Sequence, residues 1–207
     1  VLTNASKKHR LFHRGSVPID IARWKIYDRP TTSGSTSTTI TSSSAVIQPH
    51  DFVVVAADST ILSRFEYLAQ PTPAVHLFIL NRSGGLGLNN DGDDVIVRDV
   101  LGRTIDSVAY SADWHHPDLA DAKGRSLERV NPDLASNDRR NWSSSSDPSG
   151  GTPGKINGIF TNSLPSAASI SISPNPFSPD GDGFEDFCII RYSLPLATSI
   201  IRISIFD

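Results

Sequence analysis

VIVRDVLGRTIDSVAY, residues 95–110, decides the fold class of this chain. Two runs rich in β-branched residues, 95–99 and 104–110, lie on either side of a short connection that contains Gly102. A glycine-containing connection between two such runs is the sequence signal of a β-hairpin. In the second run apolar residues occupy both alternating sets of positions, so the pattern leaves open which face points inward.

The same kind of pattern continues along the chain. Helical periodicity is almost absent, and short apolar runs alternate with Gly, Pro, Asn and Asp, which predicts an all-β fold. We predict strands at 11–13, 19–27, 46–47, 51–56, 75–80, 94–99, 104–110 and 126–130. One segment, 59–69, places Ile61, Leu62, Phe65 and Leu68 on one helical face after an N-cap near Thr60, as in a short crossover helix. The Ser/Thr tract 31–44 predicts a loop or an edge strand, with a glycosylated linker as the alternative.

Composition limits the classes of partner. The 207 residues suffice for a sizeable core, and a net charge of -3 gives no overall attraction to nucleic acid or to an anionic membrane. Apolar runs such as 52–57 are far shorter than the roughly 20 residues of a membrane-spanning helix. The single cysteine, Cys188, forms no intramolecular disulfide and is expected to be a small buried strand residue.

Two domains are expected. The polar, Gly- and Pro-rich stretch 143–154 and the region around Pro165 favour a first domain at 1–160, a linker at 161–168 and a second domain at 169–207. The chain starts without a charged-then-apolar leader, and 200–207 have the pattern of a strand that stops within a domain. We therefore expect a fragment of a longer protein.

Four motifs occur in a fixed order between residues 20 and 157. They are the tryptophan strand 20–24 (DIARW), GRSLER at 124–129, Asn141-Trp142, and GTPG at 151–154 with Asn157. This ordered set resembles the bacterial lamin tail domain, which implies an immunoglobulin-like β-sandwich. The first strand departs from the family, because basic residues stand at 8–14 where the family has acidic ones.

The motif residues are expected to have structural roles. Trp24 and Trp142 are large apolar anchors for a core, and Leu127 of the GRSLER motif is likewise expected to have a structural role. Gly124 begins the GRSLER motif and Gly154 ends the GTPG motif, where Pro153 with Gly154 favours a tight turn at the end of the domain. Arg125, Glu128 and Arg129 are expected to form a charged pair on an outer face.

A second resemblance begins at Ile170. SPNPFSPDGDG at 173–183, IIRYSLP at 189–195 and ISIFD at 203–207 are similar to the first strands of the hook-capping-protein type of Ig-like domain. The similarity implies a partial Ig-like module and, because that family stands at the C-termini of many bacterial secreted and surface proteins, a secreted or cell-surface location.

One acidic motif has the ligand types of a metal site. Asp180, Asp182 and Asp186 alternate around glycine turns, and their carboxylates suit Ca²⁺, with a solvated Asp/Gly turn as the alternative. A second acidic cluster, 89–94, contains the Asp-Gly pair that hairpin turns prefer. The segment 113–118, with two histidines and two aspartates, is expected to be a loop, with zinc as the less favoured interpretation.

No catalytic residue is assigned. The sequence has no Gly-rich phosphate loop after a strand, no GxSxG elbow and no HExxH. We expect a non-catalytic structural and interaction module that attaches or spaces neighbouring domains, with protein as the partner. The alternative is an accessory module of an extracellular hydrolase or nuclease that binds DNA or polysaccharide through the basic residues Lys7, Lys8, Arg10 and Arg14. An enzyme in its own right would depend on the His115-His116 loop.

Overall fold

The computed structural model describes residues 8–29, 36–82, 86–119, 121–162, 169–194 and 203. The fold is all-β, with several small sheets and almost no helix, as the sequence predicts. The chain divides into two compact units, Val1–Asn162 and Ser163–Asp207, and the division lies within the segment 161–168 that the sequence assigns to a linker. Among the described residues, no helix has the length and apolar character needed to cross a membrane.

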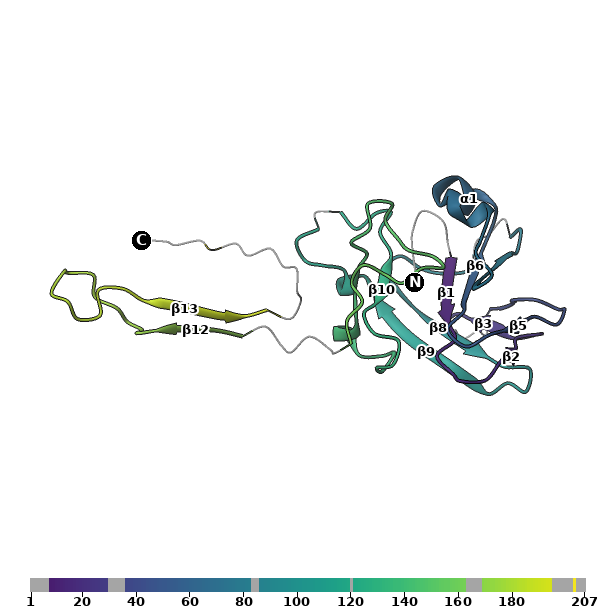
Figure 1. Ribbon diagram of the computed structural model, residues 1–207, viewed down its shortest axis with the longest axis horizontal. Coiled ribbons are helices and arrows are strands. Elements are labelled where there is room, and N and C mark those ends of the chain that lie inside the picture. Colours follow the sequence, from purple (N-terminus) through teal and green to yellow (C-terminus); the bar gives the residue numbers. More distant parts are fainter. Residues whose placement is uncertain are drawn as a thin grey trace. The chain divides into compact units, whose positions relative to one another are not determined.

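Two sheets organise the first unit (Figure 1). The three-stranded sheet has the order β1 (Lys8–Phe12), β6 (Phe52–Ala56), β7 (Val75–Ile79). The four-stranded sheet has the order β4 (Ser37–Thr39), β3 (Lys25–Tyr27), β8 (Gly92–Arg98), β9 (Thr104–Ser111). Two short antiparallel pairs accompany them: β2 (Ile19–Asp20) with β5 (Val46–Ile47), and β10 (Leu127–Arg129) with β11 (Trp142–Ser144).

The predicted hairpin is β8 and β9, and its inward face is now defined. Val95 and Val97 of β8 are buried and alternate with partly exposed neighbours. Val95 pairs with Val108 in the antiparallel register, which places Val108 on the same face of the sheet as Val95. Gly102 in the connection has φ +79, a conformation that glycine adopts without the steric cost of a side chain.

The predicted crossover helix is also present. Strands β6 and β7 are parallel, so the chain must cross over between them, and α1 (Thr60–Arg64) and the 3₁₀ helix η1 (Glu66–Ala69) lie in that crossover. Ile61, Phe65 and Leu68 are buried from the predicted face, whereas Leu62 is only partly buried. The backbone N–H of Thr60 donates to Asp58 Oδ1 at 2.8 Å. Of two further 3₁₀ turns, η2 (Ala112–Trp114) follows β9 and η3 (Arg139–Asn141) leads into β11.

Strand β6 separates two hydrophobic clusters because its side chains alternate between two faces. Val53 and Val55 belong to the larger cluster, which also contains Val95 of the other sheet, so the two sheets share one core. Val54 and Ala56 point to the opposite face and pack with α1 and η1. Every residue of 53–56 is therefore buried, which explains the continuous apolar run in the sequence.

Several predicted strands differ from the observed ones. The strand predicted at 19–27 is broken into β2 and β3, because Arg23 has φ 60 and Trp24 N donates back to Ile21 O at 3.1 Å. The Ser/Thr tract contributes the short strand β4 at an edge of its sheet, which is one of the two predicted outcomes; residues 31–35 lie outside the described part. β11 was not predicted, since residues 142–144 are too few to form a recognisable pattern.

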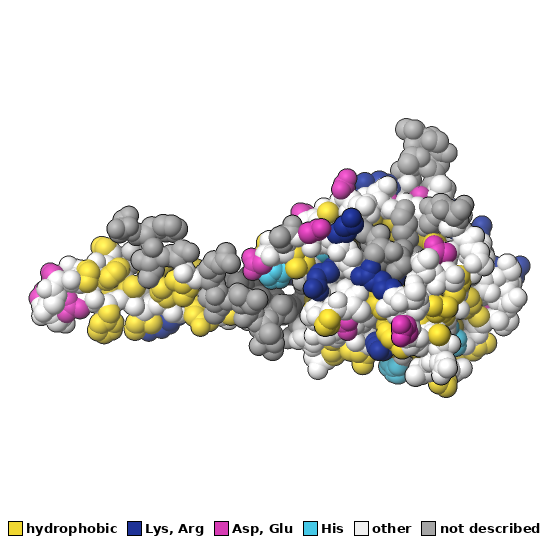
Figure 2. Space-filling model, turned by 90° about the horizontal axis from the view of Figure 1, so that it is seen from above, with side chains coloured by type: hydrophobic (Ala, Val, Ile, Leu, Met, Phe, Trp, Pro, Cys, Tyr) yellow, Lys and Arg dark blue, Asp and Glu magenta, His cyan; other side chains and the backbone are white. Residues whose placement is uncertain are grey.

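The described part of the second unit is a hairpin of β12 (Ser169–Ser173) and β13 (Ile189–Ser193). None of residues 169–194 is buried, and Cys188, expected to be buried in a strand, is half-buried and precedes β13. Large apolar side chains of this unit, such as Ile170 and Phe187, are more than 70% exposed. Hydrophobic side chains cover much of this unit on the face shown in Figure 2.

Candidate functional site

The GRSLER motif lies on and before β10 and is bound tightly into the first unit. Arg125 Nη1 donates to Ser145 O at 2.8 Å, and Ser126 Oγ donates to Gly150 O at 3.1 Å. Leu127 is 2% exposed and belongs to the core shared by the two sheets. Gly124 has φ +79, and its carbonyl accepts a hydrogen bond from Arg64 Nη2. The motif thus connects β10 to the crossover helix and to the C-terminal segment of the unit.

Glu128 is the centre of this arrangement, and it corrects one sequence-based expectation. Its side chain is completely buried rather than on an outer face. Glu128 Oε1 accepts hydrogen bonds from Thr152 N at 2.9 Å and from Thr152 Oγ1 at 2.6 Å. The expected charged pair is not made with its motif neighbours, because Arg129 Nη1 instead contacts Asp106 Oδ2 at 3.0 Å. A carboxylate in the interior therefore binds the TPG motif to β10.

The closing TPG motif is held by two further contacts. The Tyr67 hydroxyl donates to Pro153 O at 2.8 Å, and Asn157 Nδ2 donates to Arg129 O at 2.7 Å. Gly154 has φ +72, and a Cβ at this position would lie 2.8 Å from Val75 Cγ1. Both the backbone conformation and the close approach require glycine there. The last motif is therefore fixed against η1, β7 and β10.

Two cations of β1 face the same buried region as Glu128. Lys8 pairs in register with Ala56 and Arg10 pairs with Val54, so both point to the α1 side of the sheet. Lys8 is fully buried, with Nζ 4.1 Å from the centroid of the Phe65 ring. Burial, reinforced by the Arg64 charge, lowers the pKa of Lys8 to about 7, while the charge of Glu128 opposes the shift. Burial likewise lowers the pKa of Arg10.

The described basic residues of the predicted patch do not form one exposed cationic surface of the kind that binds nucleic acid. Lys7 lies outside the described residues, and Lys8 is buried. Arg10 Nη1 donates to Thr152 O at 3.0 Å and to Lys155 O at 2.6 Å, so it holds the TPG segment. Of the three described residues of the patch, only Arg14 is exposed, and its Nη1 donates to Pro132 O at 3.1 Å.

The two motif tryptophans lie at the shared core. Trp142 is 9% exposed, and its indole N–H donates to Ser136 O at 2.7 Å, which satisfies the polar atom of a buried indole. Trp24 is half-buried and packs against the same cluster. Trp114, which the motif analysis did not single out, lies 6.1 Å from the Trp142 ring between centroids. The tryptophans act as core anchors.

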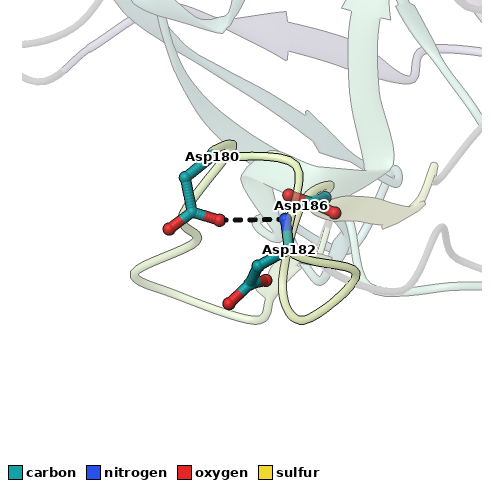
Figure 3. Close-up of side chains that lie close together, drawn as sticks. All are labelled: Asp180, Asp182 and Asp186. Carbon is teal, nitrogen blue, oxygen red and sulfur yellow. Dashed lines mark hydrogen bonds between the residues drawn. The ribbon is translucent and has the colours of Figure 1, made fainter.

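The acidic loop between β12 and β13 brings its three predicted residues together. One carboxylate oxygen from each of Asp180, Asp182 and Asp186 lies within 4.8 Å of the others, and these side chains gather in the loop shown in Figure 3. Two oxygens that bind one Ca²⁺ at 2.3–2.6 Å can be at most about 5 Å apart, so the spacing fits this ion. Asp186 also accepts hydrogen bonds from Gly181 N at 2.6 Å and Gly183 N at 2.8 Å, which order the loop.

The acidic cluster at 89–94 has a structural role, unlike the loop of Asp180, Asp182 and Asp186. Asp93 is 1% exposed, and its Oδ2 accepts from Asn89 N at 3.0 Å and from Asn89 Nδ2 at 2.8 Å. The Asp93 carboxylate therefore orders the entry to β8, with Gly92 as the first strand residue. Within the described residues, the three aspartates of the 180–186 loop are the one group with metal-ligand spacing.

One contact between a hydroxyl and an imidazole was not predicted. Ser144 Oγ of β11 lies 2.8 Å from His115 Nδ1 and accepts a hydrogen bond from His116 N at 3.0 Å. Ser144 is separated from His116 by 28 residues and from His115 by 29, so no local pattern could indicate the contact. Ser144 is 7% exposed, and its hydroxyl fixes the loop 115–116 against β11. Burial lowers the pKa of His115.

No family model matches this chain, and the search of curated proteins finds no match.

Proposed function

We propose that the chain is a non-catalytic structural and interaction module of a secreted or cell-surface bacterial protein, where it attaches or spaces neighbouring domains. The proposal includes an immunoglobulin-like sandwich of the lamin tail type for the first unit and a partial Ig-like module for the second. Protein, in the form of neighbouring domains or a separate chain, is the partner.

The observation that carries the proposal is that the motif side chains form hydrogen bonds within the chain itself. Glu128, Thr152 and Asn157 all bind the chain's own backbone or one another, as described above. Arg125 donates to the backbone carbonyl of Ser145, and Tyr67 donates to that of Pro153. Side chains used in this way stabilise a rigid body and leave its loops and strand edges as contact surfaces.

The alternative, an accessory module for DNA or polysaccharide, has weaker support. Binding to a polyanion needs cationic side chains that reach phosphates or sulfates, and each such contact adds salt dependence. Lys8 is buried, and Arg10 and Arg14 already donate to carbonyl groups. The alternative remains an outcome of the test below.

The test uses the whole chain placed between a surface anchor and a reporter domain on a bacterial cell. We expect the reporter to remain displayed after protease treatment, and Glu128→Ala to cause its loss, whereas Asp118→Ala, at a carboxylate that is 70% exposed, leaves display unchanged. Salt-dependent retention of the free chain on DNA or polysaccharide that Arg14→Ala abolishes would favour the accessory module instead. Hydrolytic turnover that His115→Ala removes would contradict a non-catalytic role.

The proposal also assigns Ca²⁺ to the loop of Asp180, Asp182 and Asp186. Its support is the spacing of the three carboxylates, which suits a hard cation with oxygen ligands. Calorimetric titration of the chain with CaCl₂ should give heat with a stoichiometry near one, and Asp182→Asn should abolish it. Asp91→Asn, outside the loop, is the matched control. No heat up to millimolar Ca²⁺ would remove the metal from the proposal.

A further inference from the structure

A cavity of about 520 Å³ lies within the first unit. Its walls come from both sheets, with Leu11 of β1 and Val53 of β6 on one side and Val95 of β8 and Val108 of β9 on the other. Trp142 also lines it. Protein interiors rarely contain voids larger than a water molecule, whereas sites for small ligands typically measure about 300–1,000 Å³ and are mostly apolar. The cavity has the size and lining of a ligand site.

Three polar residues that line this cavity carry buried atoms with no hydrogen-bond partner in the protein: His9 Nε2, Arg129 Nε and Asn157 Oδ1. They are three of the five such side-chain atoms found in the described ranges. A buried polar atom without a partner costs about 1–3 kcal/mol. Such atoms are normally satisfied by protein, by ordered water or by a ligand, and their presence around one cavity indicates a polar group inside it.

The position of His9 follows from the strand pattern. His9 pairs in register with Val55, whose side chain belongs to the core between the sheets, so His9 points into that core, while Lys8 and Arg10 point to the α1 side of the sheet. Its side chain is 3% exposed, and burial lowers its pKa to about 3, so the imidazole is neutral at pH 7. A basic residue in the first strand thus becomes a neutral polar group of the cavity.

The mouth of the cavity is apolar as well. Ile105, Ile156 and Phe160 line it, although they are 47%, 71% and 46% exposed. Large exposed apolar side chains around an opening mark binding surfaces more often than random positions. Ile156 and Phe160 flank Asn157, so the apolar mouth and one of the unpaired polar atoms belong to the same segment.

We propose that this cavity binds a small neutral molecule with an apolar body and one hydroxyl group, such as a phenol or an alcohol. The donor and acceptor types decide the class. Arg129 Nε carries a hydrogen to donate, Asn157 Oδ1 can only accept, and a hydroxyl both accepts and donates. A carboxylate would leave Asn157 Oδ1 facing another acceptor. The Asn157 amide donates to the backbone carbonyl of Arg129 at 2.7 Å, so the two residues that carry these atoms are in direct contact.

The experiment titrates the whole chain with 2-naphthol, naphthalene and 2-naphthoate and follows tryptophan fluorescence, because Trp24 and Trp142 line the cavity. We expect saturable binding of 2-naphthol and affinities at least about tenfold lower for the other two, since each leaves a polar atom unpaired. Absence of 2-naphthol binding would overturn the proposal and leave the cavity to water. Equal or tighter binding of naphthalene or 2-naphthoate would overturn the assignment of a hydroxyl ligand.

A pair of variants locates the site. Val108→Phe places additional volume in the cavity and should abolish binding of 2-naphthol, whereas Val100→Phe, at an exposed position outside the lining, should not. Retained binding in a folded Val108→Phe variant would contradict the location. The ligand comparison on the unaltered chain decides the proposal even if Val108→Phe does not fold.

Discussion

The two units use hydrophobic residues in opposite ways. In the first unit, apolar residues of both sheets enclose a shared core, and its motif side chains cross-link distant segments. In the second unit, the hairpin of β12 and β13 is at least as rich in isoleucine, yet none of residues 169–194 is buried. A two-stranded hairpin by itself is at best marginally stable in water. Composition therefore does not decide stability; burial and cross-linking do.

The largest contrast is expected from removing a carboxylate in each unit. Glu128→Ala removes the buried carboxylate that faces Lys8 and Arg10 and that accepts two hydrogen bonds from Thr152, which costs about 3–5 kcal/mol of unfolding free energy. Asp186→Ala removes an aspartate from the loop of the second unit and should leave that free energy unchanged. Urea unfolding followed by tryptophan fluorescence checks both, because Trp24, Trp114 and Trp142 all lie in the first unit. Equal stability of the two variants would contradict this account.

A matched pair of leucines tests the role of the core. Leu127 is 2% exposed and Leu194 is 37% exposed. Leu127→Ala should lose about 2–5 kcal/mol through the cavity that it creates, whereas Leu194→Ala should change stability by less than about 0.5 kcal/mol. Scanning calorimetry of the whole chain measures both. A cost for Leu194→Ala close to that of Leu127→Ala would mean that the second unit has a core of its own.

The buried lysine predicts how stability depends on pH. The pKa of Lys8 falls from 10.5 to about 7 on folding, so between these values the unfolded chain binds more protons than the folded one. Unfolding free energy should therefore rise with pH across this window, by at most about 1.4 kcal/mol per pH unit. Lys8→Met should flatten the rise, and Lys25→Met, at an exposed position, should not. Urea unfolding at pH 7 to 10 checks the slope; a flat profile for the unaltered chain speaks against a buried Lys8.

The smallest effect is expected at a single hydroxyl group. Tyr67→Phe removes the hydrogen bond to Pro153 O and should lower the unfolding free energy by about 1 kcal/mol. Tyr192→Phe in the second unit, where the ring is 52% exposed, should have no measurable effect. Thermal unfolding resolves a difference of this size. An unchanged midpoint for Tyr67→Phe would show that the closing motif does not depend on this contact.

Local patterns predicted the elements but not the long-range contacts. Alternating apolar residues located the β8–β9 hairpin, and the helical face of Ile61, Phe65 and Leu68 located the crossover. The burial of Glu128 and Lys8 could not be predicted, because charged residues are normally exposed and their partners lie far away in the sequence. The acidic loop was found because its three aspartates lie within seven residues, whereas the Ser144–His115 contact joins residues 29 apart.

Hydrogen exchange of the whole chain, measured peptide by peptide in chelator, tests the central contrast most directly. The account predicts that amides of β6, β8 and β10 exchange slowly through global unfolding of the first unit, while those of 169–194 exchange by local opening and far faster. Glu128→Ala should accelerate exchange in the first unit alone. Equally slow exchange in 169–194, or acceleration of both units by that substitution, would contradict an account in which the first unit alone supplies the buried, cross-linked core.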